Sequence, residues 1–201
     1  MASTTISPKD VSELRTRTGA GMMDCKRALE ESGGDMDKAA ELLRKKGIAK
    51  AEKRAGKVAS QGVVVSYLHH NGQVGSLVEL NCETDFVART DDFQQLARDI
   101  ALHVASADPI GVNPEDIPAD LLERERRIAE EQVAQEGKPE NIRAKIVDGK
   151  IKKFVAERTL TEQPFVRDDK KTVGQLVKEA SGKLGEAISV RRFARFKIGE
   201  V

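Results

Sequence analysis

The chain has 201 residues, of which 39% are hydrophobic and 33% are charged. This length allows one ordinary domain with a small satellite, and the composition excludes a fibrous or wholly disordered protein. The 34 Lys and Arg against 33 Asp and Glu give a net charge of +1, which removes the bulk electrostatic argument for a dedicated nucleic-acid binder. Aromatic residues make up only 3% of the chain, so there are few side chains on which the bases of a nucleic acid could stack.

The cysteines and the first residues bear on where the protein works. Cys25 and Cys82 are the only cysteines and lie far apart, so neither a disulfide framework nor a thiolate zinc site is indicated. The opening MASTTISPKDV has no apolar signal region, and nowhere do about 18 apolar residues run together. We expect a cytoplasmic protein with reduced thiols and no membrane span.

Residues 5–47 are expected to form a compact unit of three helices. Ser7 and Pro8 are typical of a helix start, and the glycines at 19 and 21 should end that helix. A second helix should end at residues 33–34 and a third at Gly47. Their apolar residues recur at helical spacing: Val11 and Leu14, then Met22, Cys25 and Leu29, then Met36, Ala39, Ala40 and Leu43.

A basic segment and a hairpin follow. Residues 44–57 carry seven Lys or Arg against the single acid Glu52, and are expected to form a basic helix or linker between two domains. Residues 63–68 and 74–80 are rich in β-branched residues and flank Asn71-Gly72, which favours a type I′ hairpin turn.

The rest of the chain is predicted to be mostly helical. Helices are expected from residue 90 or 91, at 119–136, from Pro139 onward with a weak point at Gly149, and at 172–181. Residues 107–118 should be a loop. Residues 188–198 alternate apolar and polar side chains, as in a half-buried strand. The fold class is therefore α+β, with a small N-terminal helical domain and a core with a small antiparallel sheet.

The sequence offers little that could carry out catalysis. The motifs of phosphate-binding loops, serine hydrolases and zincins are absent. His69 and His70 are neighbours whose side chains should point to opposite faces of a strand, and His103 lies one position off an apolar helical stripe. We therefore expect no catalytic residue, no metal site and no cofactor.

The segment Thr84 to Val87 is unusual, because it places Asp85 beside the large apolar ring of Phe86 between a strand and a helix. A phenylalanine is most often buried, so packing of Phe86 in the core is one interpretation. An apolar group carried on a loop of a rigid scaffold can instead anchor a partner protein.

Two motifs give the chain a resemblance to a known family. They are LRTRTGAGMMDCKRAL at residues 14–29 and NCETDFVA at 81–88, followed in the same order by LTEQPFV at 160–166 and Arg191-Arg192-Phe193. Together they resemble the translation elongation factor Ts family over essentially the whole chain. The resemblance implies a domain similar to ubiquitin-associated domains at residues 1–55 and an α+β core at 56–201.

The resemblance also implies a function. Members of this family act as guanine-nucleotide exchange factors for the GTPase elongation factor Tu. Carried over to this chain, Asp85 and Phe86 would form a wedge against the partner's GTPase domain, with Thr84 and Val87 as supports. The wedge would displace the elements that hold Mg²⁺ and the phosphate loop. The N-terminal contacts would come from Arg15, Met22 and Met23.

The chain resembles the short form of the family. Long members carry two related core subdomains and a coiled-coil insertion, whereas this chain has room for one hairpin unit and shows no heptad run. Since the missing half would supply partner contacts, we expect a homodimer in which a second copy replaces it by joining sheets.

Two other functions remain open. An RNA-binding accessory protein of the translation machinery would use residues 44–57 and the strand containing Arg191, Arg192, Phe193, Arg195 and Phe196. A plain adaptor would bind a partner without altering nucleotide release. Under the exchange-factor interpretation, no direct nucleic-acid contact is expected.

Overall fold

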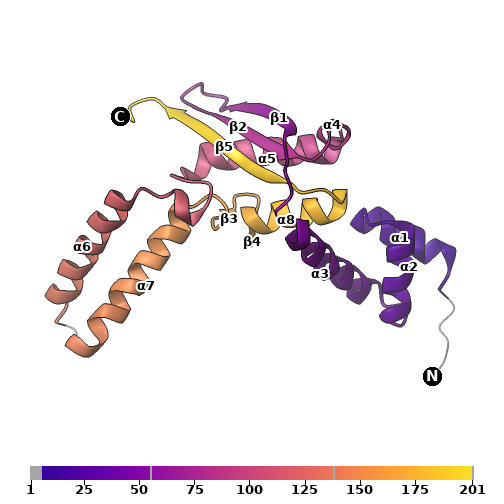
Figure 1. Cartoon of the computed structure of the whole chain (residues 1–201), viewed down its shortest axis with the longest axis horizontal. Helices are drawn as coiled ribbons and strands as arrows, with labels where there is room; N and C mark the ends of the chain where they lie inside the picture. Colours follow the sequence, from indigo (N-terminus) through magenta and orange to yellow (C-terminus); the bar gives the residue numbers. More distant parts are fainter. Residues whose placement is uncertain (1–5, 55, 138, 201) are drawn as a thin grey trace. The chain divides into compact units, whose positions relative to one another are not determined.

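The computed structural model describes residues 6–54, 56–137 and 139–200 (Figure 1). Residue 5, where the three-helix unit was expected to begin, lies outside these residues. So does residue 55, the expected domain boundary. Within the described part, the chain folds into two units. One contains the residues up to Val63 with Asn81–Leu96 and Val177–Ser189, and the other contains Val64–Leu80, Ala97–Leu176 and the residues from Val190 onward.

The N-terminal helices are α1 (Pro8–Thr18), α2 (Met22–Glu31) and α3 (Met36–Arg54). Ser7 begins α1 as predicted, because its hydroxyl accepts a hydrogen bond from the Asp10 N–H at 3.1 Å while its own N–H donates to the Asp10 carboxylate at 3.3 Å. Gly19 ends α1 with φ of +68°, a conformation that favours glycine. The helices share one buried core: Val11, Leu14, Cys25, Ala28, Leu29, Ala39 and Leu43.

The predicted end of the third helix at Gly47 is wrong, since α3 continues through it to Arg54. Gly47 lies against Gly182 of α8 (Val173–Leu184), and a Cβ atom built on Gly182 would lie 2.6 Å from the carbonyl carbon of Gly47. The glycines thus permit a close helix crossing rather than a helix end. The basic segment is accordingly helical as far as Arg54.

The main sheet has the strand order β1 (Gln61–Leu68), β2 (Val74–Cys82) and β5 (Ser189–Lys197). Burial alternates along β2, where Ser76, Val78 and Leu80 are buried and Leu77 is exposed. Helix α5 (Asp91–Ala107) packs on the buried face, where its Ala101 carbonyl accepts a hydrogen bond from Ser76 at 2.7 Å. This sheet and its helix confirm the α+β prediction.

The turn between β1 and β2 differs from the predicted type I′ turn. That turn needs positive φ at both central residues, but of Asn71 and Gly72 only Gly72 has one, at +69°. The connection is longer: the His69 N–H donates to the Val74 carbonyl, and the Gly72 N–H to the His69 carbonyl. The Asn71 side chain stabilises this loop by accepting a hydrogen bond from the Gln73 N–H at 3.0 Å.

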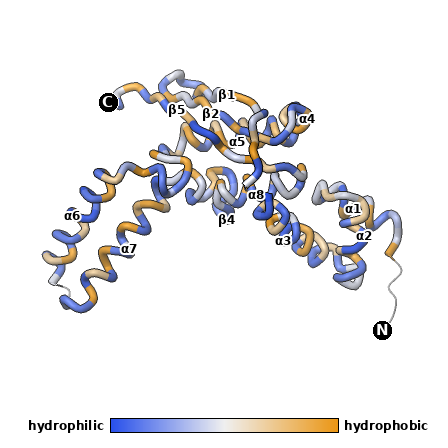
Figure 2. Tube along the Cα trace, in the orientation of Figure 1, coloured by the Kyte–Doolittle hydropathy of each residue, from blue (hydrophilic) through white to orange (hydrophobic). Residues whose placement is uncertain are grey.

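Helices α6 (Ala119–Gln135) and α7 (Glu140–Arg158) form an antiparallel hairpin (Figure 1). Hydrophobic and hydrophilic residues alternate along both helices (Figure 2), and Ala129, Val133 and Val147 form their buried seam. The sequence predicted both helices but not their pairing. Helix α7 is continuous through Gly149, where no break occurs.

The remaining elements are short. They are the single helical turn α4 (Asp85–Ala88), the 3₁₀ turn η1 (Pro114–Asp116) and the antiparallel pair β3 (Pro164–Phe165) and β4 (Asp168–Thr172). The sequence analysis did not predict the β3–β4 pair.

Candidate functional site

Helix α4 presents the unusual segment as a single helical turn between β2 and α5. Thr84 is its N-cap, with an extended backbone (φ −127°, ψ 155°) and a hydroxyl that accepts a hydrogen bond from the Val87 N–H at 3.4 Å. Ala88 is buried, whereas the side chain of Phe86 is 78% exposed. The interpretation that Phe86 packs in the core is therefore wrong, and the ring is free to contact a partner.

Two carboxylates fix the backbone just before this turn. Glu186 accepts hydrogen bonds from the Thr84 N–H at 3.0 Å, the Thr84 hydroxyl at 2.6 Å and the Glu83 N–H at 3.1 Å. Glu83 in turn accepts from the Ala187 N–H at 2.7 Å and from Arg54 at 2.9 Å. The Ala187 N–H and the Arg54 guanidinium lower the pKa of Glu83.

Further contacts hold the two ends of α4. The Cys82 thiol donates to the Thr84 carbonyl at 3.1 Å, and burial raises the pKa of that thiol. At the other end, Gln94 donates to the Ala88 carbonyl at 2.7 Å. Asp85 is paired with Arg89 at 2.7 Å on the surface. The turn is therefore anchored at both ends while its Phe86 ring remains exposed.

The predicted N-terminal contact residues lie on the helical domain. Arg15 is exposed on α1, and Met22 and Met23 open α2 with exposed fractions of 50% and 65%. The stripe that was expected to include Met22 is buried only from Cys25 onward, because Met22 lies at the very start of the helix. These three residues belong to the same folded unit as Thr84–Val87 but to different elements.

Comparison with known proteins decides the family. The family model described as elongation factor TS matches residues 28–200. Three curated proteins named elongation factor Ts are similar along nearly their whole length. The one from Desulfosudis oleivorans is 55% identical over 98% of this chain and 99% of its own, that from Thermosipho melanesiensis is 53% identical over 97% and 100%, and that from Syntrophomonas wolfei is 53% identical over 97% and 91%. The chain belongs to the elongation factor Ts family.

In this member of the elongation factor Ts family, the basic residues at 44–57 are largely neutralised by neighbouring acids. Six of the seven lie within ion-pair distance of a carboxylate. Such exposed pairs add little stability, but they reduce the local positive potential. The pairs are Arg44–Glu179, Lys45–Glu41, Lys46–Glu31, Lys50–Asp24, Arg54–Glu83 and Lys57–Glu83.

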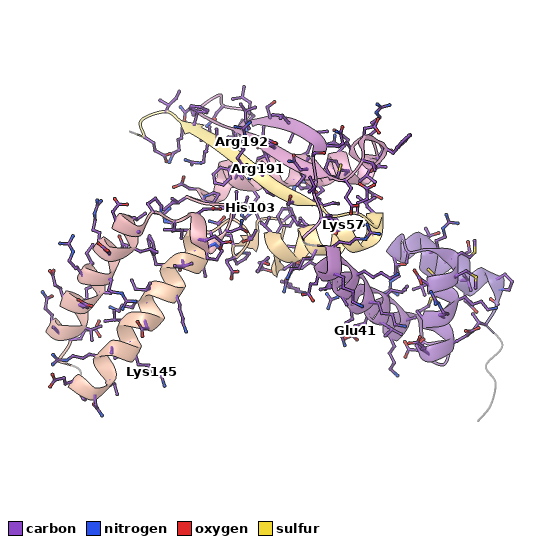
Figure 3. The ribbon with its side chains drawn as sticks, viewed as in Figure 1. Glu41, Lys57, His103, Lys145, Arg191 and Arg192 are labelled. Atoms are coloured by element: carbon purple, nitrogen blue, oxygen red, sulfur yellow. The ribbon has the colours of Figure 1, made fainter. Side chains whose placement is uncertain are left out.

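The arginines of β5 do not form one cationic surface either. Arg192 pairs with Glu79 at 2.7 Å, and Arg195 is turned inward, where it donates to the Ala105 carbonyl at 3.1 Å and pairs with Asp108 at 3.0 Å. Figure 3 shows Arg191 and Arg192 as neighbours on this strand. The alternation of cation and aromatic side chains in the sequence is therefore split between the two faces of the sheet.

The histidines have structural surroundings. His103 is buried (Figure 3). Its Nδ1 accepts a hydrogen bond from the Val166 N–H at 3.2 Å, and its Nε2 lies 3.0 Å from the side-chain oxygen of Gln163. Although His103 lies one position off the apolar stripe of its helix, it is buried, because Gln163 satisfies its polar edge. The rings of His69 and His70 lie 4.2 Å apart, so the prediction of opposite faces also fails.

The described residues hold no cluster of three or more His, Cys, Asp or Glu side chains arranged for a metal ion. Among the same residues, no helix is both long enough and apolar enough to cross a membrane.

Sequence reasoning missed Glu83 and Glu186 as residues that support the site. Glu83 lies inside a quoted motif, where its position beside Thr84 could have drawn attention to it. Glu186 follows Gly185 in a short connection about a hundred residues from Thr84, and no local pattern signals that contact.

Proposed function

We propose that this member of the elongation factor Ts family binds elongation factor Tu in its GDP form and accelerates release of GDP. It works in the cytoplasm and carries out no covalent chemistry. The observation that supports this most directly is the 78% exposed ring of Phe86 on an anchored helical turn. Exposing a large apolar ring to water costs free energy, and that cost is recovered when the ring enters a pocket of a partner.

In this proposal Asp85 and Phe86 act as the wedge, and Thr84 and Val87 hold it. Insertion displaces the partner's elements that hold Mg²⁺ and the phosphate loop, so GDP dissociates. Burying a Phe side chain contributes about 1.5–3 kcal/mol. At about 1.4 kcal/mol per tenfold, the ring supplies one or two powers of ten in nucleotide affinity, and loss of Mg²⁺ supplies the rest.

Thermodynamic linkage lets the exchange cycle turn over. The factor by which this protein weakens GDP binding to the partner equals the factor by which GDP weakens binding of this protein. Rebinding of nucleotide therefore releases the exchange factor, with no further energy source.

The N-terminal helices supply a second contact with elongation factor Tu. Met22 and Met23 offer flexible apolar side chains at the start of α2, and Arg15 offers a cation on α1. We assign this contact to an N-terminal domain of residues 1–55 and the wedge to a core of residues 56–201. Binding at the helices keeps the wedge near its target.

The protein acts as a homodimer in this proposal, with the sheet faces of two copies joined. The outward face of the three-stranded sheet carries large apolar side chains that are 46–71% exposed: Val64, Leu68, Leu77 and Phe196. A groove beside them is lined by residues of all three strands, including Leu68, Leu77 and Phe196. A second copy of the same face would cover these side chains.

Stopped-flow release of a fluorescent GDP analogue from elongation factor Tu tests the proposal. Saturating protein should accelerate release over the rate without it. Unchanged release would leave two other functions to be tried. Steeply salt-dependent binding to RNA would favour an RNA-binding accessory protein, and binding to elongation factor Tu without exchange would identify an adaptor.

A further inference from the structure

A pair of glutamates connects three chain segments directly behind the proposed wedge. Glu83 lies in the connection between β2 and α4, and Glu186 lies in the connection between α8 and β5. Each carboxylate accepts backbone N–H groups from the segment that carries the other. Arg54 and Lys57, at and just beyond the end of α3, lie 2.9 and 3.5 Å from Glu83.

The wedge needs such support because α4 is too short to be stable alone. A helix of four residues makes too few internal hydrogen bonds to offset the entropy of ordering its backbone. Its exposed Phe86 contributes little burial to the folded state. The conformation that presents the ring must therefore be imposed by neighbouring groups.

Glu186 accepts three of the hydrogen bonds that hold the entry to α4. Its three accepted hydrogen bonds satisfy both backbone N–H groups at the entry to α4 and the Thr84 hydroxyl. The same hydroxyl is thereby oriented to accept from the Val87 N–H as the N-cap. Loss of the carboxylate would leave three donors to find water or to rearrange the turn.

We propose that Glu186 is a positioning residue for nucleotide exchange, which holds α4 in the conformation that presents Phe86 to the GTPase partner. This inference rests on the proposed exchange function. Glu186 does not itself touch the partner in this account. It acts through Thr84, and its effect disappears when Phe86 is removed.

The first experiment measures GDP release from elongation factor Tu against protein concentration for wild type and Glu186→Ala. The saturating release rate of the variant should fall about tenfold, while the half-saturating concentration changes less than threefold because the N-terminal helices still bind. Glu186→Gln, which keeps one acceptor oxygen, should fall between the two. Glu31→Gln, which removes a surface carboxylate that pairs with Lys46 away from α4, is the matched control and should match wild type.

A double-mutant comparison separates positioning from general stability. If Glu186 acts through the wedge, adding Glu186→Ala to Phe86→Ala should lower the saturating rate by less than twofold beyond Phe86→Ala alone. Full multiplication of the two losses would overturn the proposal. So would a wild-type rate for Glu186→Ala.

A fluorescence measurement tests the positioning without the partner. The chain contains no Trp, so Phe86→Trp places a single indole at the wedge. Adding Glu186→Ala should lower its fluorescence anisotropy, whereas Glu31→Gln should not. Unchanged anisotropy in the protein that carries both Phe86→Trp and Glu186→Ala would overturn the positioning role. If wild type fails to accelerate GDP release but the anisotropy falls as expected, the exchange function fails while the positioning of the turn stands.

Discussion

The crossing of α3 and α8 at Gly47 and Gly182 gives two substitutions with opposite expected effects on stability. A Cβ atom on Gly182 would lie 2.6 Å from the carbonyl carbon and oxygen of Gly47 and 2.7 Å from its Cα. These are backbone atoms, which cannot rotate away. Gly182→Ala therefore has to push the two helices apart.

The magnitude follows from two opposing effects. Overpacking a tight contact costs about 1–3 kcal/mol. Replacing a helical glycine by alanine returns about 1 kcal/mol through helix propensity. Because all three close atoms belong to the backbone, the overpacking cost should lie in the upper part of that range, at about 2–3 kcal/mol. We therefore expect Gly182→Ala to lower the free energy of unfolding by about 1–2 kcal/mol. In Gly47→Ala the new Cβ would be 3.7 Å from Gly182, an ordinary contact, so this variant should gain up to about 1 kcal/mol.

Urea unfolding followed by far-ultraviolet circular dichroism measures both variants. The two midpoints should move in opposite directions at an unchanged slope. A Gly182→Ala protein as stable as wild type would refute the reasoning that this crossing is limited by backbone contact. Because Glu186 lies just beyond the end of α8, the destabilised variant should also release GDP from elongation factor Tu more slowly.

Three further predictions concern pH, helix composition and assembly. Burial lowers the pKa of His103, so its contribution to stability is fully present above its unfolded pKa of about 6.5 and is lost as pH falls through the lower folded pKa; urea midpoints between pH 5 and 7.5 should rise with pH, less steeply in His103→Gln. Gly149→Ala, with nothing within 4 Å of the new Cβ, should raise the free energy of unfolding by about 0.5–1 kcal/mol in the same assay, and a loss would contradict the open surroundings of α7. Leu77→Asp should halve the mass measured by light scattering if the sheet faces join, whereas a monomeric wild type would contradict the proposed dimer.

Local signals in the sequence predicted much of the fold. Ser7 and Pro8 mark the start of α1 because capping depends only on neighbouring residues. The helix expected from residue 90 or 91 is α5, and the alternation over residues 188–198 predicted β5, because each pattern repeats with the period of its element. The family resemblance carried by Thr84–Val87 was confirmed by comparison over nearly the full chain.

Features that depend on distant residues were not predicted. Gly47 reads locally as a helix end, but its role is set by Gly182, which lies far along the chain. The support that Glu186 gives to Thr84 likewise joins two connections with no shared local pattern. The type I′ turn predicted from Asn71 and Gly72 is wrong, because the strands are joined by a longer loop that a hydrogen bond from the Gln73 N–H to the Asn71 side chain stabilises.

Substitution of Phe86 is the most direct test of the account. Stopped-flow GDP release should be compared for wild type, Phe86→Ala and the control Val58→Ala, which truncates an apolar side chain that is 84% exposed in the same folded unit. The account predicts at least a tenfold lower saturating rate for Phe86→Ala, near-wild-type release for Val58→Ala, and unchanged circular dichroism for both. If Phe86→Ala accelerates GDP release from elongation factor Tu as much as wild type does, the wedge role of Phe86 is contradicted.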